Sequence, residues 1–539
     1  MHITFVATRK NRDPQERELY EMDLMLRVMG LKRAFADLGL LTVAACTPPG
    51  HTQVFVDEYL EPIDYDIQTD LVAMSAKTSC AGRAYEVADR FRAAGKTVVL
   101  GGIHASLRPE EALEHVDCVV IGEAEAIWPS VVADAAAGQL KKRYDPGEYP
   151  PMDAIPDPAW ELVDSSLYLF QQAQTTRGCP FTCRFCSVPD ISGQSFRFKP
   201  VDNILRELKG FPKKRRPLAR NTPLYVVDDN FLSRKTFTEE LLRGMQPAFE
   251  AGEFPHWSAE TTLNVASDEA LLDAFVAAGC DTLIIGLESV SEETLKDMAK
   301  PINFCLTFPQ ALERIHDRGL SVVGNFIVGF DTDAPRVFAD TLDFIQDTGI
   351  LYPFFSILNP MPGTKLFDDV KAEGRLYHEN WELYDTRHVV MEPAQMSPEM
   401  LQDGYIWLYE QAYASDLAWE RVERQWERYR RIGMKPRMRG GRLAKAGFTA
   451  LLAKELFRGD AALRRFFGQG LDLLTRKDLV AEPGQLMVMF DSYDFSRFMD
   501  RYKSPDYARH AEIFASRKGE EARLQWQNDR ARRRSGAAK

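Results

Sequence analysis

Three cysteines lie close together in the stretch QTTRGCPFTCRFCSVPD, residues 174–190. Cys179, Cys183 and Cys186 have the spacing C-x3-C-x2-C. Cysteines spaced in this way bind zinc or an iron–sulfur cluster, or they form disulfides in an oxidising compartment. The glycine before Cys179 and the proline after it keep this stretch out of a helix, so the loop can wrap around a metal centre.

The other cysteines help to choose between these possibilities. Structural zinc normally takes four ligands, usually from two separated C-x2-C pairs, and the sequence has no second pair. The scattered cysteines, which we expect to be small buried side chains, are Cys46, Cys80, Cys118, Cys280 and Cys305. Three thiolates on one loop suit a four-iron, four-sulfur cluster in which one iron has no protein ligand. Such an open position is where substrate or cofactor chemistry takes place in catalytic metal sites.

Length and composition are those of an ordinary globular chain. Its 539 residues suggest about three domains of ~100–200 residues each. No run of about 18 uncharged apolar residues predicts a spanning helix, and the N-terminus lacks the layout of a secretory signal. We therefore expect a cytoplasmic protein with reduced thiols. The net charge of −12 argues against a nucleic-acid partner.

Residues 1–145 alternate short apolar runs with amphipathic stretches, which predicts parallel strands joined by helical crossovers. The strand-like runs are ITFVA, LTVAAC (41–46), DLVAMSA, TVVLGG and DCVVIG, and a helix is expected over 19–40. This α/β pattern is typical of a doubly wound parallel sheet, in which ligands lie at the carboxyl ends of the strands. Glycines there let a ligand approach the backbone, although a simple turn also explains them. The small or polar residues at those ends are Ser75, Lys77, Thr78, Gly101, Gly102, Gly122, Glu123 and Glu125.

The rest of the chain divides into three parts. Residues 146–168, rich in proline and aspartate, read as an extended linker. Residues 169–395 hold about six strand-plus-helix units with no hairpin signal, which predicts a partial (βα)6 barrel. Residues 396–539 are mainly helical by pattern and carry no catalytic motif. The basic stretch at 428–442 is either a solvated face or a peripheral contact with an anionic substrate or a membrane surface.

The cysteine motif, with the aromatic Phe185 before its last cysteine, resembles that of the radical S-adenosylmethionine superfamily. The resemblance implies that Cys179, Cys183 and Cys186 hold a 4Fe–4S cluster whose open iron binds S-adenosylmethionine. The reduced cluster would then cleave that molecule to a 5′-deoxyadenosyl radical. The resemblance also implies S-adenosylmethionine contacts from the loop and from the ends of the barrel strands. These candidates are Phe185, Asp228, Asp229 and Asn230 in VVDDNF, Glu288 in GLESV, and Asn325 and Gly329 in GNFIVGF.

A second resemblance covers about residues 50–135. DLVAMSAKT, VVLGGIHAS and VDCVVIGEAEAIW resemble the cobalamin-binding domain that precedes the barrel in one large subclass. The implied cobalamin-binding residues are Ser75, Thr78, Gly101, Gly102, Gly122, Glu123 and Glu125. The Asp-x-His-x-x-Gly loop that ligates cobalt in many cobalamin proteins does not occur, and His2, His51, His104 and His115 lie in other contexts. We expect cobalamin bound without a histidine ligand; a sheet that only caps the barrel is the alternative.

The order of sheet, barrel and helical tail resembles the cobalamin-dependent radical methylases. This implies methylation of an unactivated carbon of a lipid, a tetrapyrrole or a natural-product scaffold, with flavodoxin or ferredoxin as electron donor. One alternative is a non-methylating radical enzyme that cyclises, oxygenates or rearranges its substrate, and another is a non-catalytic metal-binding scaffold protein. Aromatic residues near the strand ends and tail would either line a site for a planar or apolar substrate or form plain core. They are Trp257, Phe354, Phe355, Tyr384 and Trp407.

Overall fold

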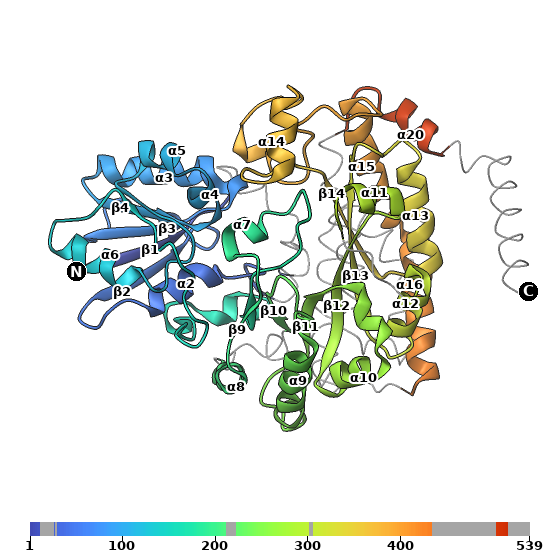
Figure 1. Ribbon diagram of the computed structural model, residues 1–539, viewed down its shortest axis with the longest axis horizontal. Coiled ribbons are helices and arrows are strands. Elements are labelled where there is room, and N and C mark those ends of the chain that lie inside the picture. Colours follow the sequence, from blue (N-terminus) through green and yellow to red (C-terminus); the bar gives the residue numbers. More distant parts are fainter. Residues whose placement is uncertain (11–25, 27–29, 212–222, 301–305, 434–502, 516–539) are drawn as a thin grey trace, which may run out of the picture.

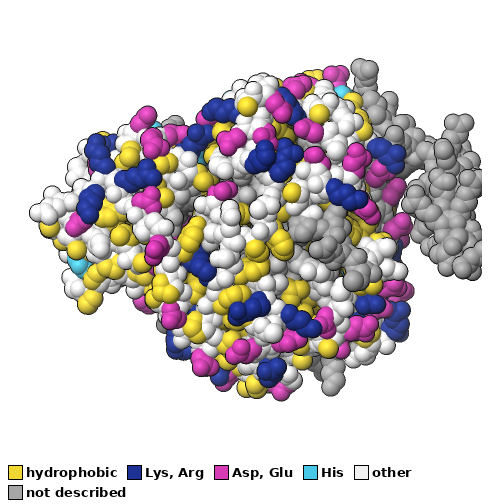
Figure 2. Space-filling view, in the orientation of Figure 1, with side chains coloured by type: hydrophobic (Ala, Val, Ile, Leu, Met, Phe, Trp, Pro, Cys, Tyr) yellow, Lys and Arg dark blue, Asp and Glu magenta, His cyan; other side chains and the backbone are white. Residues whose placement is uncertain are grey.

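The computed structural model shows two parallel sheets side by side, with α7 (Val188–Ser192) and α14 (Lys365–Ala372) between them (Figure 1). It describes residues 1–10, 26, 30–211, 223–300, 306–433 and 503–515. Most of the basic stretch at 428–442, from residue 434 onward, and Cys305 lie outside the described residues. Figure 2 shows acidic and basic side chains interspersed over one face of the molecule. None of the helices in the described ranges is long and apolar enough to cross a membrane.

The N-terminal domain is a six-stranded, wholly parallel sheet with the order β2-β1-β3-β4-β5-β6. Its strands are β1 (His2–Ala7), β2 (Thr52–Asp57), β3 (Leu71–Ser75), β4 (Thr97–Gly101), β5 (Cys118–Val120) and β6 (Arg143–Tyr144). One face is covered by α2 (Leu38–Ala45) and α6 (Trp128–Ala136), and the other by α3 (Ala81–Ala93) and α5 (Pro109–His115). Because β2 and β3 lie on opposite sides of β1, the direction of winding switches between β1 and β3. The predicted doubly wound sheet is confirmed.

One secondary-structure prediction in this domain is wrong, and a second is wrong over part of its length. LTVAAC, expected as a strand, lies in α2, whose first turn is capped by the Asp37 carboxylate accepting from the Leu40 amide at 3.0 Å. The second strand is instead TQVFVD, β2. Short apolar runs such as 41–46 fit a buried helix as well as a strand, and periodicity cannot separate the two. Of the helix predicted over 19–40, residues 30–37 are not helical, and residues 11–25 and 27–29 are not described.

The second domain is a partial barrel of six parallel strands in the order β14-β13-β12-β11-β10-β7. The strands are β7 (Gln171–Ala173), β10 (Leu224–Val226), β11 (Trp257–Thr261), β12 (Cys280–Glu288), β13 (Ser321–Val328) and β14 (Tyr352–Ile357). The helices that pack on its outer face are α8 (Val201–Gly210), α9 (Lys235–Glu250), α10 (Glu269–Ala277), α12 (Phe308–His316) and α13 (Val337–Thr348). The predicted (βα)6 barrel is confirmed.

Side chains on the inner face of the barrel are partly exposed, whereas their neighbours along each strand are buried against the helices. The partly exposed set includes Tyr225, Glu260, Ile284, Gly286, Val323, Asn325 and Phe354. Strand pairing places Gly286, Asn325 and Phe354 at one level of the sheet. The other aromatic residues singled out from the sequence, Trp257, Phe355, Tyr384 and Trp407, are buried core. The inner face is therefore the part of the barrel that a small molecule can reach, as in other parallel barrels.

Helices after the barrel cover its β14 edge. In α15 (Pro398–Ala412) the Tyr409 hydroxyl accepts from the Phe355 amide at 2.9 Å and donates to the Phe355 carbonyl at 3.0 Å. The fully buried Asp403 binds the Ser504 amide and the His510 ring, and thereby holds α20 (Tyr507–Ala515) on α15. Together with α16 (Ser415–Arg431), these helices make the described C-terminal part helical, as predicted.

One hydrophobic cluster contains side chains from both domains. Trp381 and Tyr384, which follow α14, pack with Phe367 into the apolar layer beneath α3 of the N-terminal sheet. The Trp381 ring nitrogen donates to a Glu111 carboxylate oxygen at 2.8 Å, and the ring meets His104 edge-on. Because this layer contains side chains from both domains, apolar burial fixes the sheet against the barrel.

We expect Trp381→Ala to lower the free energy of unfolding by about 3–5 kcal/mol, since it removes a buried ring that both domains contact. Denaturant titration followed by tryptophan fluorescence and circular dichroism would measure the change. Val54→Ala on the edge strand β2, where the side chain is 43% exposed, is the control and should shift stability by less than about 0.5 kcal/mol. Equal stability of Trp381→Ala and the wild type would contradict a shared core.

Candidate active site at the sheet–barrel junction

The three cysteines lie on a loop between β8 (Thr176–Arg177) and α7. The loop begins at Gly178, whose φ of 85° is in the left-handed region, and a side chain there would collide with the Ser192 carbonyl oxygen. The Cys179 amide donates to the Gly193 carbonyl at 3.1 Å, which closes the loop on itself. All three thiols are half-buried and free. Backbone contacts therefore shape the loop and leave the sulfur atoms for ligation.

The chemistry of these thiols fits an iron–sulfur cluster. Among the described residues, no three His, Cys, Asp or Glu side chains converge closely enough to hold one metal ion. A cubane cluster needs no such convergence, because its thiolates bind separate iron atoms. Burial raises the pKa of all three thiols, that of Cys186 to about 12. Ionised thiolates here would therefore need a positive centre such as iron beside them.

Two acids after β10 hold the strand that leads into this loop. The Asp228 carboxylate, 1% exposed, accepts from the amides of Thr175 at 2.6 Å and Thr176 at 3.0 Å, and from the Thr175 hydroxyl. Asp229 accepts from the Gly178 amide at 3.2 Å. Burial raises the pKa of Asp228 to about 6, and the hydrogen bonds from the threonines oppose this rise. These acids, predicted to contact S-adenosylmethionine, are engaged in positioning the cysteine loop.

Two more predicted contacts also have structural partners. The amide oxygen of Asn230 accepts from the Leu232 backbone at 3.2 Å and closes a turn. Phe185 packs edge-to-face on Phe330, with 6.3 Å between ring centroids, and joins a small apolar cluster with Met298. Phe185 thus anchors the cysteine loop to the barrel.

Glu288 and a lysine that the sequence did not single out lie beside the loop. Glu288 follows a bulge at the end of β12, has a φ of 60°, and pairs with the Lys300 ammonium at 2.7 Å. Gly286 leaves room for this pair, because a Cβ there would lie 3.2 Å from Lys300 Nζ. Burial lowers the pKa of Lys300, but Glu288, Cys183 and Cys186 raise it more, so the lysine stays charged. A lone lysine outside any motif gave no signal in the sequence.

Asn325 and Gly329 come from β13. Asn325 is on the inner face at the level of Gly286, and its side-chain amide has no hydrogen bond with any described residue. Gly329 has a φ of 99° and donates to the Asp333 carboxylate at 2.9 Å. Burial raises the pKa of Asp333 to about 7, although the hydrogen bonds from the Gly329 and Phe330 amides act to lower it. Asn325 is therefore available to a ligand, whereas Gly329 is held by its own loop.

The glycines predicted for cobalamin divide into two kinds. A Cβ on Gly102, φ 88°, would lie 2.6 Å from the Ser75 hydroxyl, so this glycine packs α4 (Gly102–Leu107) onto β3, and Gly101 lies close to Val120 in the same layer. A Cβ on Gly122, φ 66°, would meet nothing within 4 Å. The open backbone at Gly122 is thus a surface against which a flat ligand can lie.

A buried hydroxyl lies at the switch point between β1 and β3. Thr8 directly follows β1, and its hydroxyl is buried with no hydrogen-bond partner in the described part of the chain. Ser75, paired with Ala7 at the end of β3, is half-buried beside it, and Thr78 is buried at the start of the next turn. Buried polar groups normally have partners, so Thr8 favours a ligand at this switch point. The residues present therefore fit cobalamin.

The four histidines of the N-terminal domain lie away from the end of β1. His2 and His51 are at the amino ends of β1 and β2, His104 is buried against Trp381, and His115 pairs with Asp89 at 2.8 Å. None of these four is placed at the switch point between β1 and β3. His388 comes nearer to the end of β1, because its ring nitrogen contacts Asp385 at 2.9 Å and Asp385 also pairs with Lys10.

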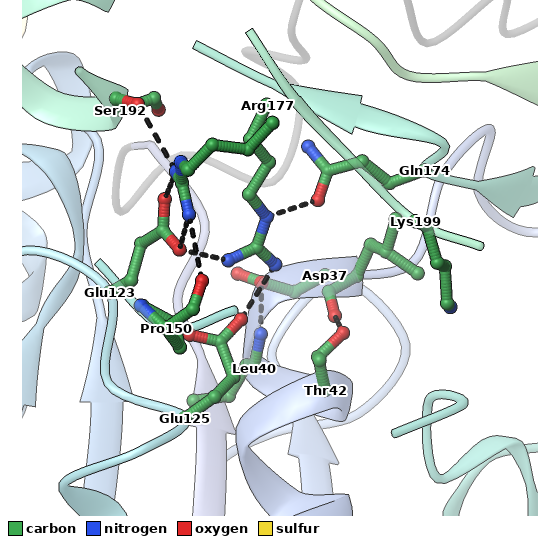
Figure 3. Close-up of polar contacts among 12 residues, drawn as sticks. Asp37, Leu40, Thr42, Glu123, Glu125, Pro150, Gln174, Arg177, Ser192 and Lys199 are labelled. Atoms are coloured by element: carbon green, nitrogen blue, oxygen red, sulfur yellow. Dashed lines mark hydrogen bonds and ion pairs between the residues drawn. The ribbon is translucent and has the colours of Figure 1, made fainter. Parts of the chain in front are cut away.

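The two acids predicted for cobalamin bind two arginines that flank the cysteine loop. Arg177 pairs with Glu123 at 2.8 Å and with Glu125 at 2.6 Å (Figure 3). Arg197 pairs with Glu123 as well. Burial lowers the pKa of Arg177, but Glu125 and Glu123 raise it more. The loop after β5 thus contacts the two short strands, β8 and β9 (Arg197–Phe198), that flank the cysteine loop.

Comparison with known proteins assigns separate parts of the chain to three families. The Radical SAM superfamily matches residues 173–345, the B12 binding domain matches 34–132, and a domain of unknown function (DUF4070) matches 364–481.

Curated relatives cover most of the chain. The chain is 31% identical over 393 residues to bacteriochlorophyllide d C-12(1)-methyltransferase of Chlorobaculum tepidum, which covers 72% of this chain and 84% of that protein. It is 32% identical over 391 residues to the C-8(2)-methyltransferase of the same organism, with 70% and 84% covered. The solved structure of the cobalamin-dependent S-adenosylmethionine radical enzyme OxsB, with aqua-cobalamin and S-adenosylmethionine bound, has a TM-score of 0.59 at 14% identity and covers 96% of this chain and 84% of OxsB. This last likeness supports the fold.

We expect Asp228→Asn to lower the iron bound per chain after anaerobic reconstitution to about half or less. The amide cannot accept from all three threonine donors, and the donors left unpaired weaken the loop. Iron and sulfide analysis would measure the loss, and circular dichroism would check the fold. Asp331→Asn, which removes an exposed acid paired with Arg375, should load normally. Full iron content in Asp228→Asn would contradict the anchoring role.

Proposed function

This chain belongs to the radical S-adenosylmethionine superfamily, in the subclass with an N-terminal cobalamin-binding domain, and we propose that it methylates an unactivated carbon of a small molecule. The cofactors of this class are a 4Fe–4S cluster, S-adenosylmethionine and cobalamin. The observation that carries the proposal is that Arg177, the residue directly before the cysteine loop, is bound by Glu123 and Glu125 of the loop after β5. Methyl transfer to a substrate radical needs both cofactors at one cavity. Similarity to two bacteriochlorophyllide d methyltransferases over 70% or more of the chain supports the same reaction.

Each cofactor has residues of this chain assigned to it. We assign Cys179, Cys183 and Cys186 to the cluster, and Asn325 with its free amide to the nucleoside part of S-adenosylmethionine. We assign Gly122 and the switch point between β1 and β3 to cobalamin. When bound, the reduced cluster supplies the electron that cleaves S-adenosylmethionine, and cobalamin supplies the methyl group. Reduced flavodoxin or ferredoxin is the proposed electron donor.

Lys300 is the proposed partner of the S-adenosylmethionine carboxylate. Its ammonium lies over Gly286 on the inner face, and its charge acts on all three cysteine thiols. The Glu288 carboxylate holds the Lys300 ammonium there. The backbone of Glu288 itself is in the left-handed conformation, which is rare outside glycine and is often kept at functional sites. The carboxylate of S-adenosylmethionine, in place of Glu288 or beside it, would accept a charge-assisted hydrogen bond from the Lys300 ammonium.

The proposed substrate is an apolar or planar scaffold, with a tetrapyrrole as the first candidate. The inner face offers the partly exposed Ile284 as apolar surface and a Glu260 carboxylate bound to the Tyr225 hydroxyl as its polar group. Val323 and Phe354 are partly exposed as well, but they also pack against the cluster that holds Ala418 and Val422 of α16. Both methyltransferase relatives act on a bacteriochlorophyllide. A lipid or another natural-product scaffold would use the same apolar surface.

Product analysis tests the reaction. Protein reconstituted anaerobically with iron, sulfide and hydroxocobalamin is incubated with a reductant, bacteriochlorophyllide d and S-adenosylmethionine whose methyl group is deuterated. We expect S-adenosylhomocysteine, 5′-deoxyadenosine and a deuterium-labelled product. Cys183→Ala should give none of the three, whereas Cys280→Ala, a buried core position in β12, should retain them.

Two other outcomes would overturn the proposal. Deoxyadenosine formed with a changed but unlabelled product would identify a non-methylating radical enzyme. Neither nucleoside product from cluster-loaded protein would point to a metal-binding scaffold protein.

We expect Lys300→Met to raise the Kd for S-adenosylmethionine about tenfold or more, because a charge-assisted hydrogen bond is worth roughly 1.5–3 kcal/mol. Binding to cluster-loaded protein by equilibrium dialysis would measure it, with iron content as the check that the cluster is intact. Lys296→Met, at an exposed position of the preceding helix α11 (Glu292–Asp297), is the matched control. An unchanged Kd in Lys300→Met would exclude the carboxylate contact.

A further inference from the structure

Four charged residues form a buried network between the two cofactor-bearing loops: Arg177 and Arg197 from the barrel, and Glu123 and Glu125 from the N-terminal domain. The side chains of Arg177, Glu123 and Glu125 are 11%, 9% and 7% exposed. The assignments above give neither arginine a ligand. We call this set the interdomain network.

Arg177 is the centre of this network. Its Nε donates to the Gln174 side chain at 2.7 Å, while its two terminal nitrogens reach Glu123 and Glu125. Figure 3 shows the guanidinium enclosed by these three side chains. A planar guanidinium can bind three acceptors in fixed directions, which a lysine cannot do. The position of β8, two residues before Cys179, is therefore tied to the loop that follows β5.

Arg197 ties the other end of the cysteine loop to the same glutamate. It lies opposite Arg177 in the antiparallel pairing of β8 with β9 (Arg197–Phe198). Its guanidinium contacts Glu123 and donates to the backbone carbonyls of Ser192 and Pro150, each at 3.1 Å. Ser192 precedes Gly193, whose carbonyl accepts from the Cys179 amide. Glu123 is thus connected to both ends of the loop that holds the three thiols.

Adhesion between the domains does not require this network. The shared apolar core around Trp381 already fixes the sheet against the barrel. Buried ion pairs add little net stability compared with apolar packing of the same volume, because desolvation offsets the attraction. What the network adds is a defined position of the cysteine loop relative to Gly122 and Glu123.

We propose that the interdomain network couples the two cofactor sites, so that cluster binding by the barrel and corrinoid binding by the N-terminal domain strengthen each other. The inference rests on the assignment of the two cofactors to these two loops, and it does not depend on methyl transfer. Coupling of binding is reciprocal, so the cluster must strengthen corrinoid binding by the same factor as the corrinoid stabilises the cluster.

A four-protein cycle tests the coupling. The Kd for hydroxocobalamin is measured by equilibrium dialysis for anaerobic cluster-loaded wild type, cluster-free Cys183→Ala, cluster-loaded Arg177→Gln, and the double variant Arg177→Gln/Cys183→Ala. We expect the cluster to tighten corrinoid binding about fivefold or more in the wild-type background. In the Arg177→Gln background the same comparison should give a clearly smaller ratio, because Arg197 alone then still joins Glu123 to the cysteine loop.

Because the coupling is reciprocal, the effect of the corrinoid on cluster stability gives a second measurement. Iron release from cluster-loaded protein to a chelator should slow on adding hydroxocobalamin in the wild type and should slow clearly less in Arg177→Gln, which keeps only the Arg197–Glu123 connection. Arg83→Gln is the matched control, since it removes a buried ion pair with Glu58 that lies wholly inside the N-terminal domain. It should keep the wild-type ratio of dissociation constants.

Two results would overturn the inference: a wild-type ratio near one, or a wild-type ratio that persists in Arg177→Gln. If Arg177→Gln does not fold, Arg177→Gln/Glu125→Gln carries the same test, because removing opposite charges together leaves fewer unpaired charges buried. Cluster content and corrinoid binding are measured without substrate, so a failure of methyl transfer leaves this test intact.

Discussion

The cysteine loop has little regular structure of its own, and buried charged groups around it impose its shape. Asp228 and Asp229 fix its entry strand, Arg197 and the Gly193 carbonyl fix its exit, and Phe185 fixes its middle. Ligand groups bind a metal centre well only when the groups behind them are held. The rest of the site depends on this constraint, because an open iron position is useful only if it faces the other cofactors.

Both sheets place their ligand-binding loops at the carboxyl ends of parallel strands. Parallel strands expose their loops at one edge, so a doubly wound sheet and a parallel barrel each concentrate ligand-binding groups at their carboxyl ends. The chain joins these edges through residues that follow α14, which place Trp381 in the N-terminal core. Glu123 after β5 and Arg177 before the cysteine loop then meet at close range. The apolar core brings the domains together, and the ion pairs define which loops touch.

Much of this architecture follows from local pattern. Apolar runs bounded by turn residues located β3, β4, β5 and the later barrel strands, and the cysteine spacing located the cluster ligands. The failure at 41–46 has a local cause as well, since a short apolar run does not distinguish a helix from a strand. The contact between Glu123 and Arg177 joins residues 54 positions apart, and no periodicity encodes it. Lys300 was missed for the same reason, because only the fold brings it to the thiols.

Asp228 and Asp229 were found in the sequence and Asp333 was not, and the role of each acid depends on which way its carboxylate faces. An acid at a strand end can serve a ligand or the backbone of the next loop, and the two uses look alike in a sequence. Asp228 and Asp333 are surrounded by backbone amides. Burial raises the pKa of both, and the amide donors restrain the rise. A carboxylate held by several donors in a buried position has one orientation, so these acids define loop geometry, and Asn325 and Lys300 are the residues that we propose contact the ligand.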